Sequence, residues 1–263
     1  MESSLSQSYE SLLRAVGHYL GFGLDVDSYS EEQLYQADEV SIQGGLRKFY
    51  APEPMGKMPP VQWSFLRPIM SLSLKAAVGD YDLPDDFSSL IGKVTILSTT
   101  GNYSNLLVQN EGQIREARSA NTITGIPRVC AVRAKPVNKG FGQRWEMLFY
   151  PTPSTTYTIE LKALVNPSKL SATNPYPYGG MQHAQTILQA CLSEAEEKVQ
   201  DIANGPQRVA YLGRLAASIS LDAQSRGEHL GYCGDPGTPE CYQGQQRGIW
   251  TDRTSATYNG VSY

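Results

Sequence analysis

Hydrophobic residues near the start of the chain recur every three or four positions over residues 5–20. This spacing predicts an amphipathic helix that stops at Gly21 and Gly23. A second helix is expected to begin at Ser30, whose hydroxyl can accept backbone N–H groups, while Glu31 and Glu32 complement the positive helix end. We expect this second helix to direct three apolar side chains inward, namely Leu34, Ala37 and Val40.

The middle of the chain has a different pattern. Its apolar segments are mostly short, rich in β-branched or aromatic residues, and separated by Gly, Pro, Asn or Asp, which predicts antiparallel strands. In TYTIELKALV, apolar and polar residues alternate from Tyr157 onward, which is typical of a sheet with one buried and one solvated face. Such a sheet needs a cover, and we expect the helices that follow it to supply one.

Helical spacing returns after the phrase NPYPYGG. The pair Gly205-Pro206 is expected to break this region into two helices, because proline is tolerated in a first helical turn. The first predicted apolar stripe comprises Met181, Ala184, Leu188, Cys191, Ala195, Val199 and Ile202. The second comprises Val209, Leu212, Leu215, Ala216 and Ile219. Beyond Arg226 the sequence is rich in Gly, Thr, Ser and Tyr and has no sustained period, so it cannot build a core of its own.

These patterns predict an α+β protein: a helical bundle formed by the N- and C-terminal helices, with an antiparallel β-rich insertion domain and an extended C-terminal arm. The expected boundaries are residues 1–60 for the N-terminal helices and 61–170 for the β-rich domain. They are residues 171–228 for the C-terminal helices and 229–263 for the arm. A chain of 263 residues is long enough to bury the core that this arrangement requires.

Composition narrows the classes of function. With 22 Lys+Arg against 26 Asp+Glu the formal net charge is −4, so no global positive field is available for tight DNA binding. The first twenty residues do not resemble a secretion signal, and no apolar run is long enough for a membrane span. The four cysteines are too scattered for a disulfide framework, which suits a reducing compartment.

The sequence offers little reactive chemistry. The three histidines, His18, His183 and His229, belong to separate segments, and no hydrolase or nucleotide-binding motif is present. The aspartates of GDYDLPDDF favour a solvated loop, with an acid pair of an enzyme as the alternative. Cys233 and Cys241 bracket a turn and are expected to bind no metal. We therefore predict no catalytic, metal or cofactor-binding residues, and no enzymatic activity.

Several phrases carry a resemblance to a known class of virion proteins. They are LRKFYAPEP and WSFLRP after the early helices, DYDLPDDFSSLIG before the β-rich middle, and FYPTPSTTYTIELKALVNPSKLS before NPYPYGGMQHAQTILQACLSEAEEK. Over roughly residues 8 to 226 the chain resembles the head-to-tail adaptor (connector) proteins of tailed bacteriophages, including the tail-tube adaptors of short-tailed phages. The resemblance implies a structural neck protein that forms a ring of about twelve copies matched to the portal.

The same resemblance implies the partners. They are the portal protein, a tail or nozzle/stopper protein, other copies of the chain, and DNA in transient contact as it passes through a central channel. The implied location is the neck of the virion, between the capsid portal and the tail, after assembly in the host cytoplasm. By analogy with adaptors whose C-terminal arm docks into the portal, we expect four aromatic residues of the arm to bind it: Tyr242, Trp250, Tyr258 and Tyr263.

Two other functions stay open at this point. A neck stopper or tail-terminator subunit would also be acidic and poor in motifs, although the long C-terminal helices favour the adaptor. A carbohydrate-binding module of a tail protein is the alternative from another class, because exposed tyrosines on a sheet can stack on sugars. Such modules rarely devote both termini to amphipathic helices.

Overall fold

The computed structural model describes residues 5–53, 61–97, 104–137, 140, 142–225, 257–258 and 261–262. It divides into two units, residues 1–225 and 226–263. In the second unit, β10 (Thr257–Tyr258) pairs with β11 (Val261–Ser262) in an antiparallel ladder. All other elements belong to the first unit.

The first helical segments follow their capping signals. Ser8 accepts a hydrogen bond from the backbone of Ser11 at the start of the first helix, and Ser30 and Gln33 form a complete capping box at the next. The chain then continues through a π-helical stretch without a break. In order, these elements are α1 (Tyr9–Tyr19), η1 (Val26–Ser28), α2 (Glu31–Tyr35), η2 (Gln36–Ile42) and α3 (Gln43–Tyr50).

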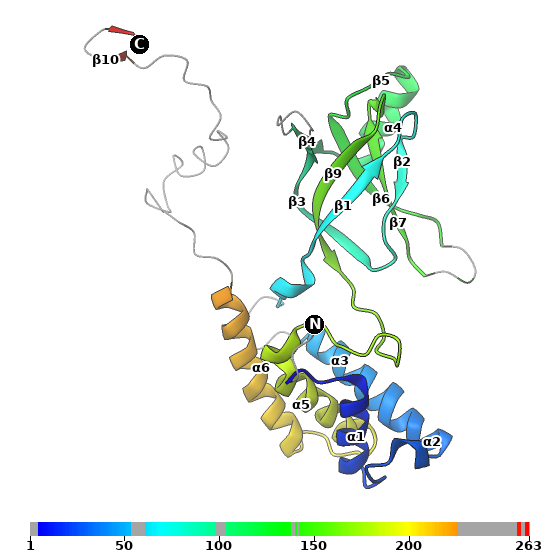
Figure 1. Ribbon diagram of the computed structural model, residues 1–263, viewed down its shortest axis with the longest axis vertical. Coiled ribbons are helices and arrows are strands. Elements are labelled where there is room, and N and C mark those ends of the chain that lie inside the picture. Colours follow the sequence, from blue (N-terminus) through cyan, green and yellow to red (C-terminus); the bar gives the residue numbers. More distant parts are fainter. Residues whose placement is uncertain are drawn as a thin grey trace. The chain divides into compact units, whose positions relative to one another are not determined.

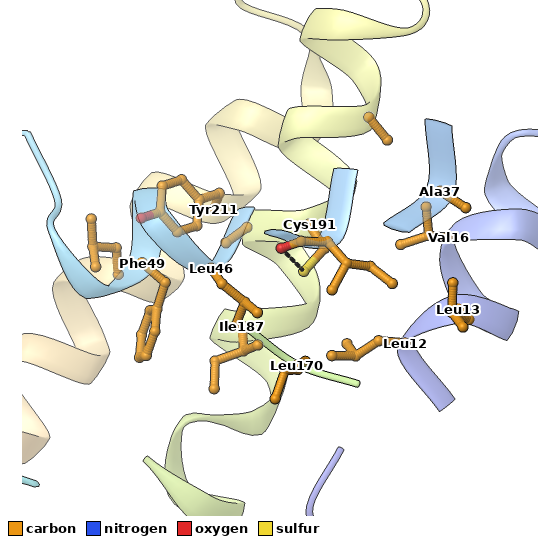
Figure 2. Packing of buried hydrophobic residues seen from close by; sticks show 14 of the residues in the cluster. Leu12, Leu13, Val16, Ala37, Leu46, Phe49, Leu170, Ile187, Cys191 and Tyr211 are labelled. Atoms are coloured by element: carbon orange, nitrogen blue, oxygen red, sulfur yellow. Dashed lines mark hydrogen bonds between the residues drawn. The ribbon is translucent and has the colours of Figure 1, made fainter. Parts of the chain in front are cut away.

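The C-terminal helices pack on these segments. Helix α5 (Gly180–Lys198) contacts α1, α3 and α6 (Pro206–Ser225), and their buried side chains form one hydrophobic cluster (Figure 1, Figure 2). Gly45 of α3 lies so close to α5 that an added Cβ would stand 2.5 Å from the Cα of Cys191. Gly45, which has no side chain, therefore allows the two helices to approach closely.

The middle of the chain forms one seven-stranded sheet in the order β1-β9-β3-β4-β6-β7-β2. It is preceded by a short 3-10 helix, η3 (Ser64–Leu66), and a separate two-stranded ladder joins β5 to β8. The strands are β1 (Ile69–Leu74), β2 (Asp80–Asp82), β3 (Phe87–Leu97), β4 (Ser104–Val108), β5 (Thr124–Gly125), β6 (Val129–Ala134), β7 (Trp145–Tyr150), β8 (Thr152–Pro153) and β9 (Tyr157–Val165).

The sheet curves around its own core into a nearly closed, barrel-like form (Figure 1). Strands β1, β3, β4, β6, β7 and β9 all contribute buried side chains to one hydrophobic cluster, which includes Leu74, Phe87, Phe149 and Ile159. Strand β9 alternates buried and solvent-facing residues as its sequence predicts. The sheet thus buries one face against itself instead of using the helices as a cover.

Within the seven-stranded sheet, one connection departs from the expected antiparallel pattern. Helix α4 (Glu111–Ala120) links β4 to β6, and these two strands pair in parallel. A parallel pair needs a crossover connection, and a helix is the usual one. Ile114 of α4 packs with Ala131 and Leu148 in a small third cluster.

The predicted fold class was therefore wrong. The described chain is not a helical bundle with an antiparallel insertion, because the barrel-like sheet has a separate core comparable in extent to that of the helices and includes a parallel pair. Several inward assignments also fail, since six apolar side chains expected in the core are exposed: Leu34, Met181, Ile202, Val209, Leu212 and Ala216. The helix break at Gly205-Pro206 is confirmed, because α6 begins at Pro206.

Candidate functional site

The aspartates after Gly79 lie among cations contributed by other segments. Asp80 and Asp82 stand on the edge strand β2, with Arg118 2.7 Å from Asp80 and Lys135 2.7 Å from Asp82. Asp85 pairs with a further arginine in the same way. The structure thus brings together the acidic loop and the basic residues that appear scattered in the sequence. Each of these three carboxylates faces a cation, which is a stabilising arrangement instead of an acid pair flanking a substrate.

Arg133 is the centre of this network. Its guanidinium hydrogen-bonds Glu146 of β7 and lies within 3.8 Å of both Asp80 and Glu111. The pKa of Arg133 is raised, mainly by the hydrogen bond to Glu146. Burial lowers this pKa by a smaller amount, and the nearby acidic residues raise it further. Arg118 also donates to the backbone oxygens of Gly79 and Phe149, which ties α4 to the sheet edge. The sequence carries no short-range signal for this network, because its members come from four segments.

Two surface depressions lie beside this network. One, of about 410 Å³, is lined by residues that include Asp80, Arg118 and Tyr150. The other, of about 550 Å³, has a mostly apolar lining that includes Ile126 and Pro151. In the first depression the charged side chains are paired with each other, so its lining presents no unpaired acid and base together.

Ion pairs and caps also join the helices. Lys48 of α3 lies 3.0 Å from Glu194 and 2.9 Å from Glu197 of α5, and these hydrogen bonds raise the pKa of Lys48 against the opposing effect of burial. The buried carboxylate of Glu196 accepts the backbone N–H groups of Gln207 and Arg208 at the start of α6. A carboxylate at this position satisfies helix donors and complements the helix dipole. This cap joins two helices and was not predicted from the sequence.

Two cysteines and one histidine of the described residues are packed in the core. Cys130 and Cys191 are buried, and burial raises the pKa of each thiol to about 12. The expected core position of Cys191 is confirmed. His183 is buried among Phe49, Trp63 and Phe65, and burial lowers its pKa. Among the residues that the structure describes, no group of three or more potential ligands surrounds a metal site.

The four proposed portal-binding residues belong to the second unit. Tyr242, Trp250 and Tyr263 lie outside the described residues, as do Cys233 and Cys241. Tyr258 lies in β10, and the structure describes its backbone alone. Their role stays a prediction.

The described surface includes apolar side chains that no other described residue covers. On α6 they include Val209, Leu212 and Leu221, and on α2 they are Leu34 and Tyr35. None of the described helices is long and apolar enough to cross a bilayer. Exposed apolar groups on a well-packed fold are typical of a protein that works by binding other macromolecules.

A comparison with protein families agrees with a role in binding other macromolecules. A model of the SU10 adaptor protein family matches residues 8–232, which is most of the chain, so the protein belongs to that family. A search of curated proteins finds no match. Family membership confirms the resemblance to head-to-tail adaptors and assigns the chain a structural role in the phage particle, at its neck.

Proposed function

We propose that the chain forms a ring of about twelve copies below the portal, which joins the DNA-filled capsid to the tail and lets the genome pass. The observation that supports this most is the match to the adaptor family over residues 8–232. A ring matched to the portal would give each copy three kinds of neighbour: the portal above, a tail or nozzle/stopper protein below, and copies of itself on both sides.

The electrostatic properties of the chain are compatible with a channel for DNA. Its formal net charge is −4, and Arg118, Arg133 and Lys135 are held by carboxylates of the same chain. Cations engaged in such pairs have less capacity to hold phosphates. A mildly acidic ring of this kind would let DNA slide and would retain it weakly.

The portal contact is proposed for the arm. Among the described residues, both large hydrophobic clusters and the small third cluster are formed by side chains between Tyr9 and Ile219. Aromatic residues are common anchors of interfaces, and the arm carries Tyr242, Trp250, Tyr258 and Tyr263. The cost of ordering the arm would be offset by the area that it buries on the portal.

The test compares the full chain with a chain truncated after Gly227, using the portal protein encoded with it as the probe. The truncated chain should unfold at the same temperature as the full chain but should no longer be retained by immobilised portal. Undiminished retention would contradict the assignment of the arm.

A matched full-length control separates the arm from exposed aromatics in general. Tyr176 and Tyr178 are exposed on the segment before α5, outside the arm. Their replacement by serine should leave retention by the portal unchanged, whereas replacement of Trp250 and Tyr258 should abolish it. Loss of retention in the Tyr176 and Tyr178 variant would assign the contact to the first unit instead.

A further inference from the structure

We propose that adjacent copies of this chain bind head to tail, with the outer face of α6 of one copy seated on the acidic segment 24–35 of the next. This inference rests on the proposed ring and names the two surfaces that close it. The occupant of each surface is therefore a second copy of the chain.

The outer face of α6 is apolar and basic. Val209 is 67 % exposed and stands on the side of the helix opposite the buried residues Tyr211 and Leu215, and Leu212, which is 42 % exposed, flanks Val209. Small residues continue this face, and a Cβ added to Gly213 would meet nothing within 4 Å. A second backbone can approach such a surface closely.

The charges on α6 have one sign on the outside. Arg208 and Arg214 are its only cations, and Arg214 is exposed without an ion pair to any described residue. The only carboxylate of the helix, Asp222, is buried and accepts hydrogen bonds from the backbone and hydroxyl of Ser64. Arg208 lies 3.4 Å from Glu197 of α5, so the charge of α6 that is not paired within the described residues is the +1 of Arg214.

The segment 24–35 has the opposite character. It includes η1 and α2, contains no lysine or arginine, and exposes all four of its carboxylates, so that its formal charge is −4. Among these carboxylates stand exposed apolar side chains, including Leu34 at 41 % and Tyr35 at 61 %. Both surfaces thus combine an apolar centre with charge, and the charges are complementary.

The two surfaces lie on different sides of the helical layer. Helix α5 contacts α6 and also contacts α1, and Figure 1 shows α6 on one side of α5 and α2 on the other. The acidic segment of a chain is therefore not seated on its own α6. Two unlike surfaces on opposite sides make a heterologous contact, which closes into a ring when the rotation between copies is suitable.

Charge reversal tests this pairing in the full-length chain. In Arg214→Glu, the α6 face repels the acidic segment of a neighbour. In the triple variant Asp27→Lys/Glu31→Lys/Glu32→Lys, the formal charge of the segment changes from −4 to +2, so the segment repels the α6 face instead. Each variant alone should associate at least about tenfold more weakly than the wild type, because like charges placed together across an interface cost several kcal/mol.

An equimolar mixture of the two variants should recover association. In an alternating arrangement, each reversed surface meets a partner of opposite charge, so the repulsion that weakens each variant alone is relieved. The readout is the mass distribution by sedimentation velocity over a range of protein concentrations, starting from the 28.9 kDa subunit. The matched control is Arg115→Glu, which reverses a highly exposed arginine on α4 and should associate like the wild type.

The proposal is overturned if the wild type stays a monomer at every concentration, if the separate variants associate like the wild type, or if their mixture fails to recover. Imaging with the portal keeps this result distinct from the proposed function. Rings on the portal that form equally well from the wild type and from each variant alone would contradict the α6 contact and leave the adaptor ring intact. Absence of rings from the wild type would contradict both.

Discussion

The cap of α6 by Glu196 gives a sharp prediction for stability. The carboxylate is buried, and its Oε2 lies 2.9 Å from the backbone nitrogen of Gln207 and 3.2 Å from that of Arg208. Gly205 makes room for it, because a Cβ there would stand 2.2 Å from the carboxyl carbon. Glu196→Ala removes a charged acceptor from two helix donors and should lower the free energy of unfolding by about 2–4 kcal/mol.

The assay is urea denaturation of the full chain followed by circular dichroism, with the melting temperature as a second readout. A loss of that size should lower the melting temperature by about 5–10 °C in a chain of this length. Glu196→Gln keeps an acceptor but loses the charge, so it should lie between the wild type and Glu196→Ala.

The matched control is Glu10→Gln, which removes an exposed carboxylate paired with Arg14 and should change stability by less than about 0.5 kcal/mol. If Glu196→Ala is as stable as this control, the capping argument is wrong.

Three further predictions concern glycine, cysteine and histidine positions. Gly45→Ala should destabilise the chain by about 1–3 kcal/mol, because its Cβ collides with the α5 backbone, whereas Gly213→Ala should stabilise it by up to about 1 kcal/mol in the same denaturation assay. In a variant with Cys233 and Cys241 replaced by serine, the folded chain should resist thiol reagents at pH 8, because burial raises the pKa of Cys130 and Cys191 to about 12. Rapid labelling of this variant would contradict the burial of the two cysteines. Burial lowers the pKa of His183, so the neutral histidine stabilises the fold above the pKa that this residue has in the unfolded state, and this stabilisation is lost as the pH falls below that value. The variant His183→Phe should therefore show a flatter dependence of the free energy of unfolding on pH between pH 7 and pH 5. An unchanged pH profile would refute this.

The sequence predicts elements whose causes are local. The serine at position 30 caps α2, the alternation in TYTIELKALV becomes β9, and the proline at 206 opens α6, as expected. Each depends on hydrogen bonds or periodicity within a few residues. Periodicity alone did not identify the buried face of α6, because apolar residues occur on both sides of that helix. Val209 and Leu212 are exposed, whereas Tyr211 and Leu215 are buried.

The fold class depends on contacts between distant segments, and these were not predictable from single-segment patterns. A strand alternates in the same way whether its sheet is open under helices or curved around its own core. Helix α4 has one fully buried apolar residue, Ile114, so the helical periodicity of its sequence is weak. Because this connecting helix was not predicted, the parallel pairing of β4 and β6 was not predicted either. The same holds for the network around Arg133.

The most direct test of the central claim is electron microscopy of the purified chain mixed with the portal protein encoded with it. Our account predicts a ring of the chain, of about twelve copies, bound to one end of the portal. Portal particles that never carry a ring of this chain, under conditions in which the chain is folded, would contradict it.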